Sequence, residues 1–160
     1  MIDRSPAARV ADIRSLARPL TTDADLDPLV ARARDRRFVA IGEASHGTHD
    51  YYDWRSRLTR RLIQEQDVGW IGVEGDWPDC WRIDRWVRRL ADQHLDARTL
   101  LAGFDRWPTW MWANAEVAEF IDWLRAWNAD RPEAAQVGFY GLDVYSLWDS
   151  LDRVIGWVGA

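Results

Sequence analysis

The stretch WIGVEGDWPD, residues 70–79, decides the fold class. Its first half is a short apolar run that ends in a carboxylate, and such a run is typical of a buried strand. Pro78 then suits the first turn of a helix that continues through WRIDRWVRRL. A strand that passes directly into a helix is the repeating unit of α/β proteins.

The same order of elements extends in both directions from this stretch. Upstream, RFVAIGE (residues 37–43) is predicted to be a buried strand, followed by a loop and a helix over residues 50–66. Downstream, a long helix is expected over residues 114–130 and a third strand, QVGFYGLD, over residues 136–143, before a last helix. We therefore expect an α/β fold with a parallel sheet, flanking helices and right-handed crossovers.

The bulk composition limits the classes of partner. The 160 residues are enough for one domain with a real core. A net charge of −5 argues against nucleic acid and anionic membranes as partners. The single cysteine, Cys80, cannot form an internal disulfide, and no apolar run resembles a signal peptide or a membrane span. We expect a cytoplasmic protein with a small-molecule partner and no cofactor, whose oligomeric state the sequence leaves open.

Three carboxylates lie at the ends of predicted strands. Glu43, Glu74 and Asp143 each close one of them, and His46 follows the first by three residues. In a parallel sheet, ligands bind outside the carboxyl ends of the strands. Each acid taken alone is more often a solvated loop residue or a helix cap, but three at matching positions indicate a site.

His46 is the candidate general base. An imidazole with an ordinary pKa near ~6.5 can accept a proton at neutral pH. A carboxylate on its other nitrogen would fix the tautomer, and either Glu43 or Glu74 could supply it. Ser45 fails the G-x-S-x-G pattern of a nucleophilic serine because position 43 is Glu, so water is the expected attacking group. Cys80, on a helix without a neighbouring histidine, is a weaker nucleophile still.

The helix after the His46 loop brings further candidates. Arg55 is a solvated surface residue, a cation that holds Glu74, or a group that stabilises an oxyanion. Four residues are predicted to bind substrate: His49, Tyr52, Trp77 and Asp143. Twelve tryptophans are unusual for this length, and most are expected in the core. A minority could form an aromatic wall for a bulky ligand: Trp54, Trp77, Trp107, Trp110 and Trp112.

A metal site is the less favoured interpretation of the same residues. Glu43, His46, His49 and Glu74 are all plausible ligand types. However, His46 and His49 form only a loose H-x-x-H pattern, well short of the H-E-x-x-H signature. We therefore expect no metal.

Three segments together resemble the erythromycin esterase family over residues 37–152: GEASHGTHDYYDWRSRLTRRLIQEQ, VEGDWPDCWRIDRWVR and GLDVYSLWDSL. The resemblance implies metal-independent hydrolysis of a macrolide lactone, an activity linked to antibiotic resistance. It implies that His46 is the general base that activates water. Glu43, Arg55 and Glu74 match the other motif positions and would complete the catalytic group.

The resemblance also implies a longer protein. Family members extend well beyond this length and carry further site residues and helices downstream. Residues 1–160 therefore resemble one α/β domain that forms the N-terminal part of a longer domain, with an incomplete sheet. Two alternatives to an active hydrolase stay open: a truncated, non-catalytic remnant, and a module that binds a metal or a tetrapyrrole. Some of the tryptophans would then lie on surface that further polypeptide normally covers.

Overall fold

The computed structural model describes residues 5–104 and 108–159. Its elements, in chain order, are α1 (Pro6–Leu16), η1 (Asp23–Leu26), α2 (Asp27–Ala33), α3 (His49–Gln66), β1 (Trp70–Asp76), α4 (Trp77–Val87), α5 (Ala97–Leu101), η2 (Thr109–Met111), α6 (Ala115–Asn128), η3 (Glu133–Ala135), β2 (Gly138–Asp143) and α7 (Leu147–Val158), where η marks short 3₁₀ helices.

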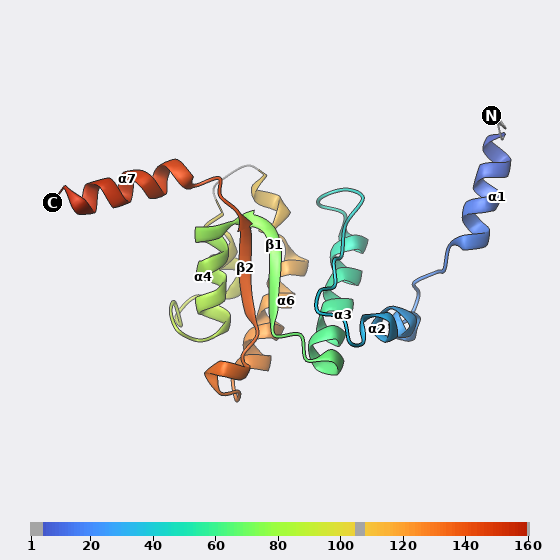
Figure 1. Cartoon of the computed structure of the whole chain (residues 1–160), viewed down its shortest axis with the longest axis horizontal. Coiled ribbons are helices and arrows are strands. Elements are labelled where there is room, and N and C mark those ends of the chain that lie inside the picture. The colour runs from blue at the N-terminus through green and yellow to red at the C-terminus, as the bar shows by residue number, and fades with distance from the viewer. Residues whose placement is uncertain (1–4, 105–107, 160) are drawn as a thin grey trace.

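Strands β1 and β2 form the centre of the fold (Figure 1). They run parallel, with Trp70 opposite Gly138 and Asp76 opposite Asp143. A bulge lies between Val73 and Asp76. The predicted α/β class, with a parallel sheet and flanking helices, is confirmed, and in the described ranges the sheet has only these two strands.

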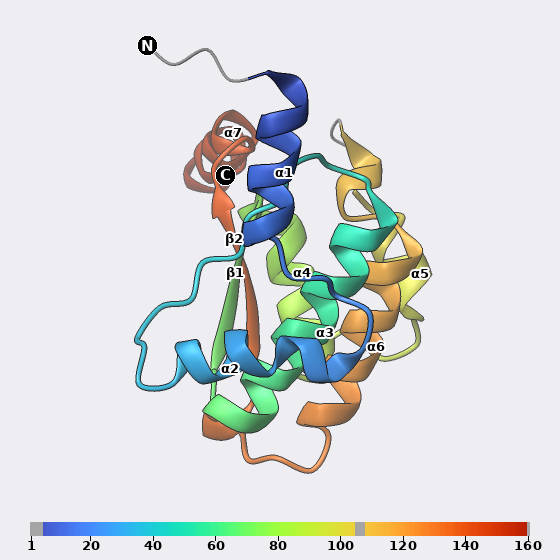
Figure 2. The same cartoon turned by 90° about the vertical axis from the view of Figure 1, so that its right-hand side faces the viewer.

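One face of the sheet is covered by helices. Seen edge-on, the strands have α3, α4, α5 and α6 on one side (Figure 2). Phe139, on β2, points to this side and is buried, and Ile71 of β1 packs against the same core. Ile83 of α4 and Leu124 of α6 are fully buried beneath them. This face holds the hydrophobic core.

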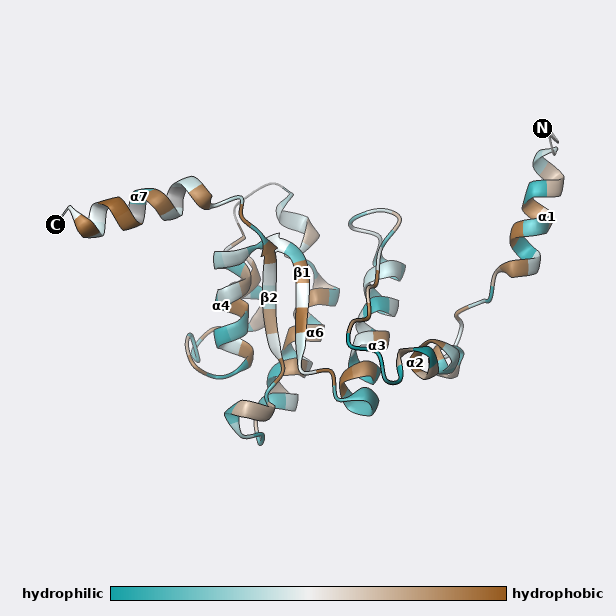
Figure 3. Ribbon diagram, viewed as in Figure 1, coloured by the Kyte–Doolittle hydropathy of each residue, from teal (hydrophilic) through white to brown (hydrophobic). Residues whose placement is uncertain are grey.

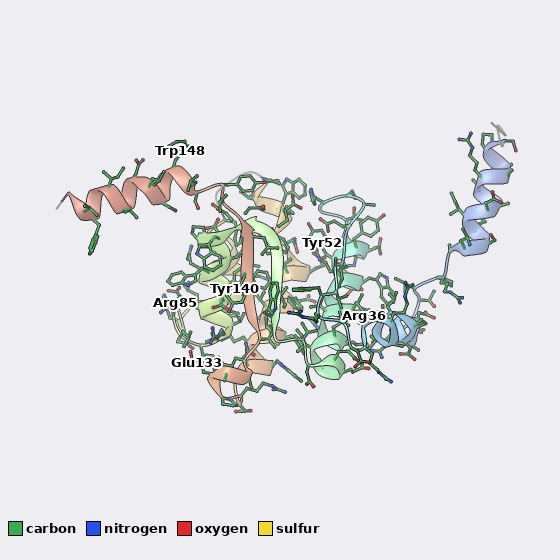
Figure 4. All side chains as sticks on the ribbon, viewed as in Figure 1. Arg36, Tyr52, Arg85, Glu133, Tyr140 and Trp148 are labelled. Carbon is green, nitrogen blue, oxygen red and sulfur yellow. The ribbon has the colours of Figure 1, made fainter. Side chains whose placement is uncertain are left out.

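Among the residues that the structure describes, no helix covers the opposite face of the sheet (Figure 2). Its side chains come from the alternate positions of each strand: Trp70 is 48% exposed and Leu142 is 65% exposed. The ring of Tyr140, labelled in Figure 4, lies 6.5 Å from that of Trp70 and 6.1 Å from that of Trp77, which stacks on it. We call the surface formed by Trp70, Trp77, Tyr140 and Leu142 the open face.

The strand predicted at residues 37–43 does not form. The segment is irregular, and Phe38, Val39 and Ile41 are exposed. It runs past α2 and α3, where it lines a surface cavity of about 460 Å³. A strand needs a hydrogen-bonded neighbour, and within the described ranges neither β1 nor β2 pairs with this segment.

The first and last helices project away from the body in opposite directions (Figure 1). The described residues of α1 include none that is buried. Helix α7 carries much apolar surface, visible as brown bands in Figure 3, and Trp148 on it (Figure 4) is 75% exposed. Across the described ranges, no helix combines the length and apolar character needed to cross a membrane.

Candidate functional site

The loop that carries His46 is built around one glycine. Gly47 has a φ of +75°, a left-handed conformation that suits glycine. A Cβ at this position would lie 2.9 Å from the ring of Trp110, so only glycine lets that ring pack here. The Gly47 N–H donates to the Tyr52 hydroxyl at 3.3 Å, and the Ser45 and Thr48 hydroxyls lie 2.6 Å apart. The Ser45 hydroxyl is therefore engaged within the loop.

His46, Glu43 and Arg55 form a hydrogen-bonded relay. The Nδ1 atom of His46 bonds to Oε1 of Glu43, and Arg55 donates to Oε2 of the same carboxylate at 2.8 Å. The Glu43 side chain is only 10% exposed, whereas that of His46 is 41% exposed. Because an ionised carboxylate can only accept, Nδ1 carries the proton and Nε2 of a neutral His46 carries the lone pair. Within the described residues Nε2 has no hydrogen-bond partner.

This geometry resolves two alternatives that the sequence left open. Glu43, rather than Glu74, is the carboxylate on the Nδ1 side of His46. Glu43 is also the carboxylate that Arg55 binds. An oxyanion-stabilising role for Arg55, the other functional alternative, stays a prediction.

Two aromatic rings enclose the Arg55 guanidinium. Its Cζ lies 4.2 Å from the centre of the Tyr52 ring and 5.3 Å from that of Trp112. Trp112 in turn donates its Nε1–H to the backbone carbonyl of Glu74 at 2.8 Å. The relay is therefore attached, through Trp112, to the carboxyl end of β1.

A second histidine–carboxylate pair lies beside the loop. Nδ1 of His49, the first residue of α3, lies 2.5 Å from Oε1 of Glu116 in the first turn of α6. This hydrogen bond raises the pKa of His49 and lowers that of Glu116. A cavity of about 240 Å³ adjoins the pair, lined by Gly47, Tyr52, Trp110, Asn114 and Glu116.

The strand-end carboxylates gather only in part. Asp143, at the end of β2, has a raised pKa because of its burial and the nearby charges of Glu74 and Asp76. Glu74 therefore lies near Asp143, as the parallel sheet predicted. Glu43 comes from a loop, so the three predicted acids do not sit at three strand ends. A direct catalytic role for the exposed Glu74 side chain stays a prediction.

The aromatic residues predicted to contact a ligand lie in different parts of the structure. Tyr52 is buried, and its hydroxyl holds Gly47, so its ring supports the loop. Trp77 lies on the open face and stacks on Tyr140. Trp54 lies under the guanidinium of Arg57, 4.7 Å from its Cζ. Of the remaining wall candidates, Trp110 and Trp112 contact the site, and Trp107 lies outside the described residues.

Two other kinds of site were possible from the sequence: a nucleophilic cysteine and a metal centre. Burial raises the pKa of the Cys80 thiol to about 12, which argues against a nucleophilic thiolate. Across residues 5–104 and 108–159, no group of three or more His, Cys, Asp or Glu side chains is arranged to hold a metal ion.

Sequence reasoning missed Glu116, and it anticipated Trp112 only as part of an aromatic wall for a ligand. Trp112 and Glu116 reach it from 38 and 67 residues away from their partners. One weak signal was present for Glu116, because Asn114 predicts a helix start that places this carboxylate in the first turn.

Comparison with known proteins places the chain in a family and a fold. The family model described as erythromycin esterase matches residues 63–160, more than half of the chain. The matched range begins after the His46 loop, which the motif resemblance covers instead.

Two solved structures share the fold. A succinoglycan biosynthesis protein superposes with a TM-score of 0.67 and 24% identity over 86% of this chain and 34% of its own. A Bacillus cereus protein superposes with a TM-score of 0.65 and 22% identity over 95% of this chain and 38% of its own. The chain thus spans little more than a third of the length of either structure.

Proposed function

Because the chain belongs to the erythromycin esterase family, we propose that it carries the general-base site of a carboxylic ester hydrolase. The substrate would be a macrolide lactone or a related ester. One observation carries the proposal: the Glu43 carboxylate binds Nδ1 of His46 on one side and Arg55 on the other.

The relay prepares His46 to activate water. With its proton on Nδ1, the imidazole presents the lone pair of Nε2 to the outside of the loop. A water molecule there gives a proton to Nε2 as its oxygen attacks the ester carbonyl. The imidazolium that forms is stabilised by Glu43, as in a catalytic triad.

The same proton completes the reaction. Attack produces a tetrahedral intermediate with a negative oxygen, which collapses and breaks the bond to the leaving alkoxide. His46 returns its proton to that alkoxide, and the products are a carboxylic acid and an alcohol. In a macrolide, both groups stay in one opened chain, so the mass rises by one water.

Arg55 acts mainly on the carboxylate in this proposal. Its guanidinium binds Glu43 and is enclosed by Tyr52 and Trp112, so it holds Glu43 in the orientation that His46 requires. In this orientation the Glu43 carboxylate accepts from Nδ1, which keeps the proton of a neutral His46 on that nitrogen.

The cavity beside the loop would take the ester group. At about 240 Å³ it is smaller than the roughly 300–1,000 Å³ pockets that enclose drug-sized ligands. A macrolide would therefore need further surface, beyond the residues that line this cavity. His49, Tyr52, Trp77 and Asp143 remain proposed substrate contacts, and Tyr52 lines this cavity. A small-molecule substrate and a cytoplasmic location also remain part of the proposal.

The test is hydrolysis by the purified chain of a macrolide and a panel of simple esters, followed by mass spectrometry in ¹⁸O-labelled water. We expect a gain of one labelled water in at least one substrate, lost in His46→Ala. Metal analysis and an absorption spectrum of the same sample address the metal and tetrapyrrole alternative. Stoichiometric metal or a Soret band would favour that alternative.

A non-catalytic role is the second candidate, and a specific observation favours it. The chain exposes large apolar side chains on the open face and on α7, among them Leu142 and Trp148. A folded, metal-free sample that leaves every ester intact would support this second candidate.

A further inference from the structure

Trp112 lies between the sheet and the relay, and the proposed mechanism gives it no role beyond its contact with Arg55. Its side chain is almost fully buried, at 8% exposure. One edge of the indole donates to the carbonyl of Glu74 at the end of β1, and the ring lies against the Arg55 guanidinium. The ring also meets Phe139 edge-on, with centres 6.2 Å apart.

Gly75 of β1 leaves room for this indole beside the strand. A Cβ on Gly75 would lie 3.3 Å from Nε1 of Trp112 and 2.9 Å from Sγ of Cys80. Even an alanine at this position would press on the indole at the atom that anchors it. Gly75 therefore permits the close approach of Trp112 to the strand end.

Arg55 depends on its surroundings for orientation. It makes one hydrogen bond to Glu43, through a single nitrogen, although a guanidinium carries five N–H donors. One such bond leaves rotation about its axis free. The rings of Tyr52 and Trp112 restrict that rotation, and Tyr52 is itself fixed by Gly47.

We propose that Trp112 is a positioning residue of the His46 site, which acts by holding Arg55 against Glu43 and so fixes the proton of His46 on Nδ1. The link runs from the Glu74 carbonyl through Trp112 and Arg55 to the Glu43 carboxylate. Glu74 thus contributes its backbone carbonyl, rather than its side chain, to this link. The proposal rests on His46 being the base, but its test reads the imidazole itself rather than turnover.

The experiment is ¹⁵N NMR of the imidazole nitrogens at a pH where the rings are neutral. Three histidines keep the spectrum simple. In the wild-type chain, Nδ1 of His46 should give the signal of a protonated nitrogen and Nε2 that of an unprotonated one. In Trp112→Leu the two signals should shift toward each other, as an unrestrained ring exchanges between tautomers.

Two milder variants keep the test decisive if Trp112→Leu does not fold. Trp112→Phe keeps a ring for Arg55 but loses the Nε1–H, so the shift should be smaller. Gly75→Ala keeps the indole but displaces its anchor, and should shift the same two signals. Circular dichroism checks that each variant is folded.

Trp127→Leu is the matched control. It also removes a tryptophan under a guanidinium, since Arg131 Cζ lies 3.5 Å from the centre of that ring, but Trp127 lies near the C-terminal end of α6. We expect wild-type His46 signals in this variant.

Unchanged His46 signals in folded Trp112→Phe and Gly75→Ala would overturn the positioning role, whatever the turnover. Equal shifts in Trp127→Leu would overturn it too, because the effect would then be global. Failure of the general-base proposal would give a different result. Ester hydrolysis would then survive in His46→Ala, while the tautomer result for Trp112 stood.

Discussion

The helix-covered face of the β1–β2 sheet and its open face are made by the same alternation of side chains in the same two strands. On the covered side, Phe139 is 2% exposed and belongs to a core shared with α4 and α6. On the other side, Leu142 is 65% exposed, and the rings of Trp70 and Trp77 each pack against that of Tyr140. The sequence of a strand therefore sets which residues share a face, whereas the elements packed on that face decide whether it becomes core.

The first prediction compares two leucines, one from each environment. Leu124→Ala removes a fully buried side chain on α6, and we expect a loss in the free energy of unfolding of about 2–5 kcal/mol. Leu142→Ala, on the open face, should change it by no more than about 0.5 kcal/mol. Urea denaturation measures both. A similar loss in the two variants would mean that the open face is covered in solution, for instance by another copy of the chain.

The second prediction compares two glycines, Gly141 on β2 and Gly72 on β1. A Cβ on Gly141 would lie 2.4 Å from the carbonyl oxygen of Gly75, where the two backbones approach closely. We expect Gly141→Ala to cost about 1–3 kcal/mol, because backbone atoms cannot move aside.

Gly72→Ala is the counterpart on the open face. Its new Cβ would meet only the side-chain ends of Trp70 and Leu142, which are exposed and can rotate. Its cost in thermal or urea unfolding should be clearly smaller than that of Gly141→Ala. The reverse order would show that the open face is packed more rigidly than its exposure indicates.

The smallest expected effect concerns the His49–Glu116 pair, which joins the start of α3 to the first turn of α6. The hydrogen bond raises the pKa of His49 above its ordinary 6.5, so the stabilisation from His49 is complete below that pH and is lost as the pH rises through the raised pKa. Glu116, whose pKa is lowered from 4.5, stabilises above that value and loses its contribution as the pH falls through the lowered pKa.

Glu116→Gln tests this pH dependence. The difference in unfolding free energy between wild type and variant should be largest between pH 4.5 and 6.5 and should shrink toward alkaline pH. It should be small throughout, because the His49 side chain is 72% exposed. Glu119→Gln, on the same helix, controls for the change in net charge. Parallel pH profiles for wild type and Glu116→Gln would show that the pair does not form in solution.

The parts of the fold that the sequence predicted have local causes. Residues 70–79 were assigned correctly because the strand run and the proline at the first helical turn lie side by side. Asn114 marked the start of α6, where its side chain accepts the Val117 N–H. The segment 37–43 was assigned wrongly because its apolar run reports burial tendency, and a strand also requires a neighbour that no local pattern supplies.

The same distinction applies to the site. Glu43 and His46 are three residues apart in one loop, so their contact was one of the predicted alternatives. Arg55 was predicted to hold Glu74, but the fold places it on Glu43. The contacts of Trp112 with Glu74 and of Glu116 with His49 join positions far apart in the sequence. Only the tertiary fold brings them together, and no spacing rule anticipates them.

The central claim is that His46 is the base, and the most direct measurement is kcat/KM for ester hydrolysis by the wild-type chain, His46→Ala and a His94→Ala control. We predict a loss of about 10²–10⁴-fold in His46→Ala, the usual contribution of a general base, and little change in His94→Ala. A folded His46→Ala variant that keeps wild-type kcat/KM would contradict the account.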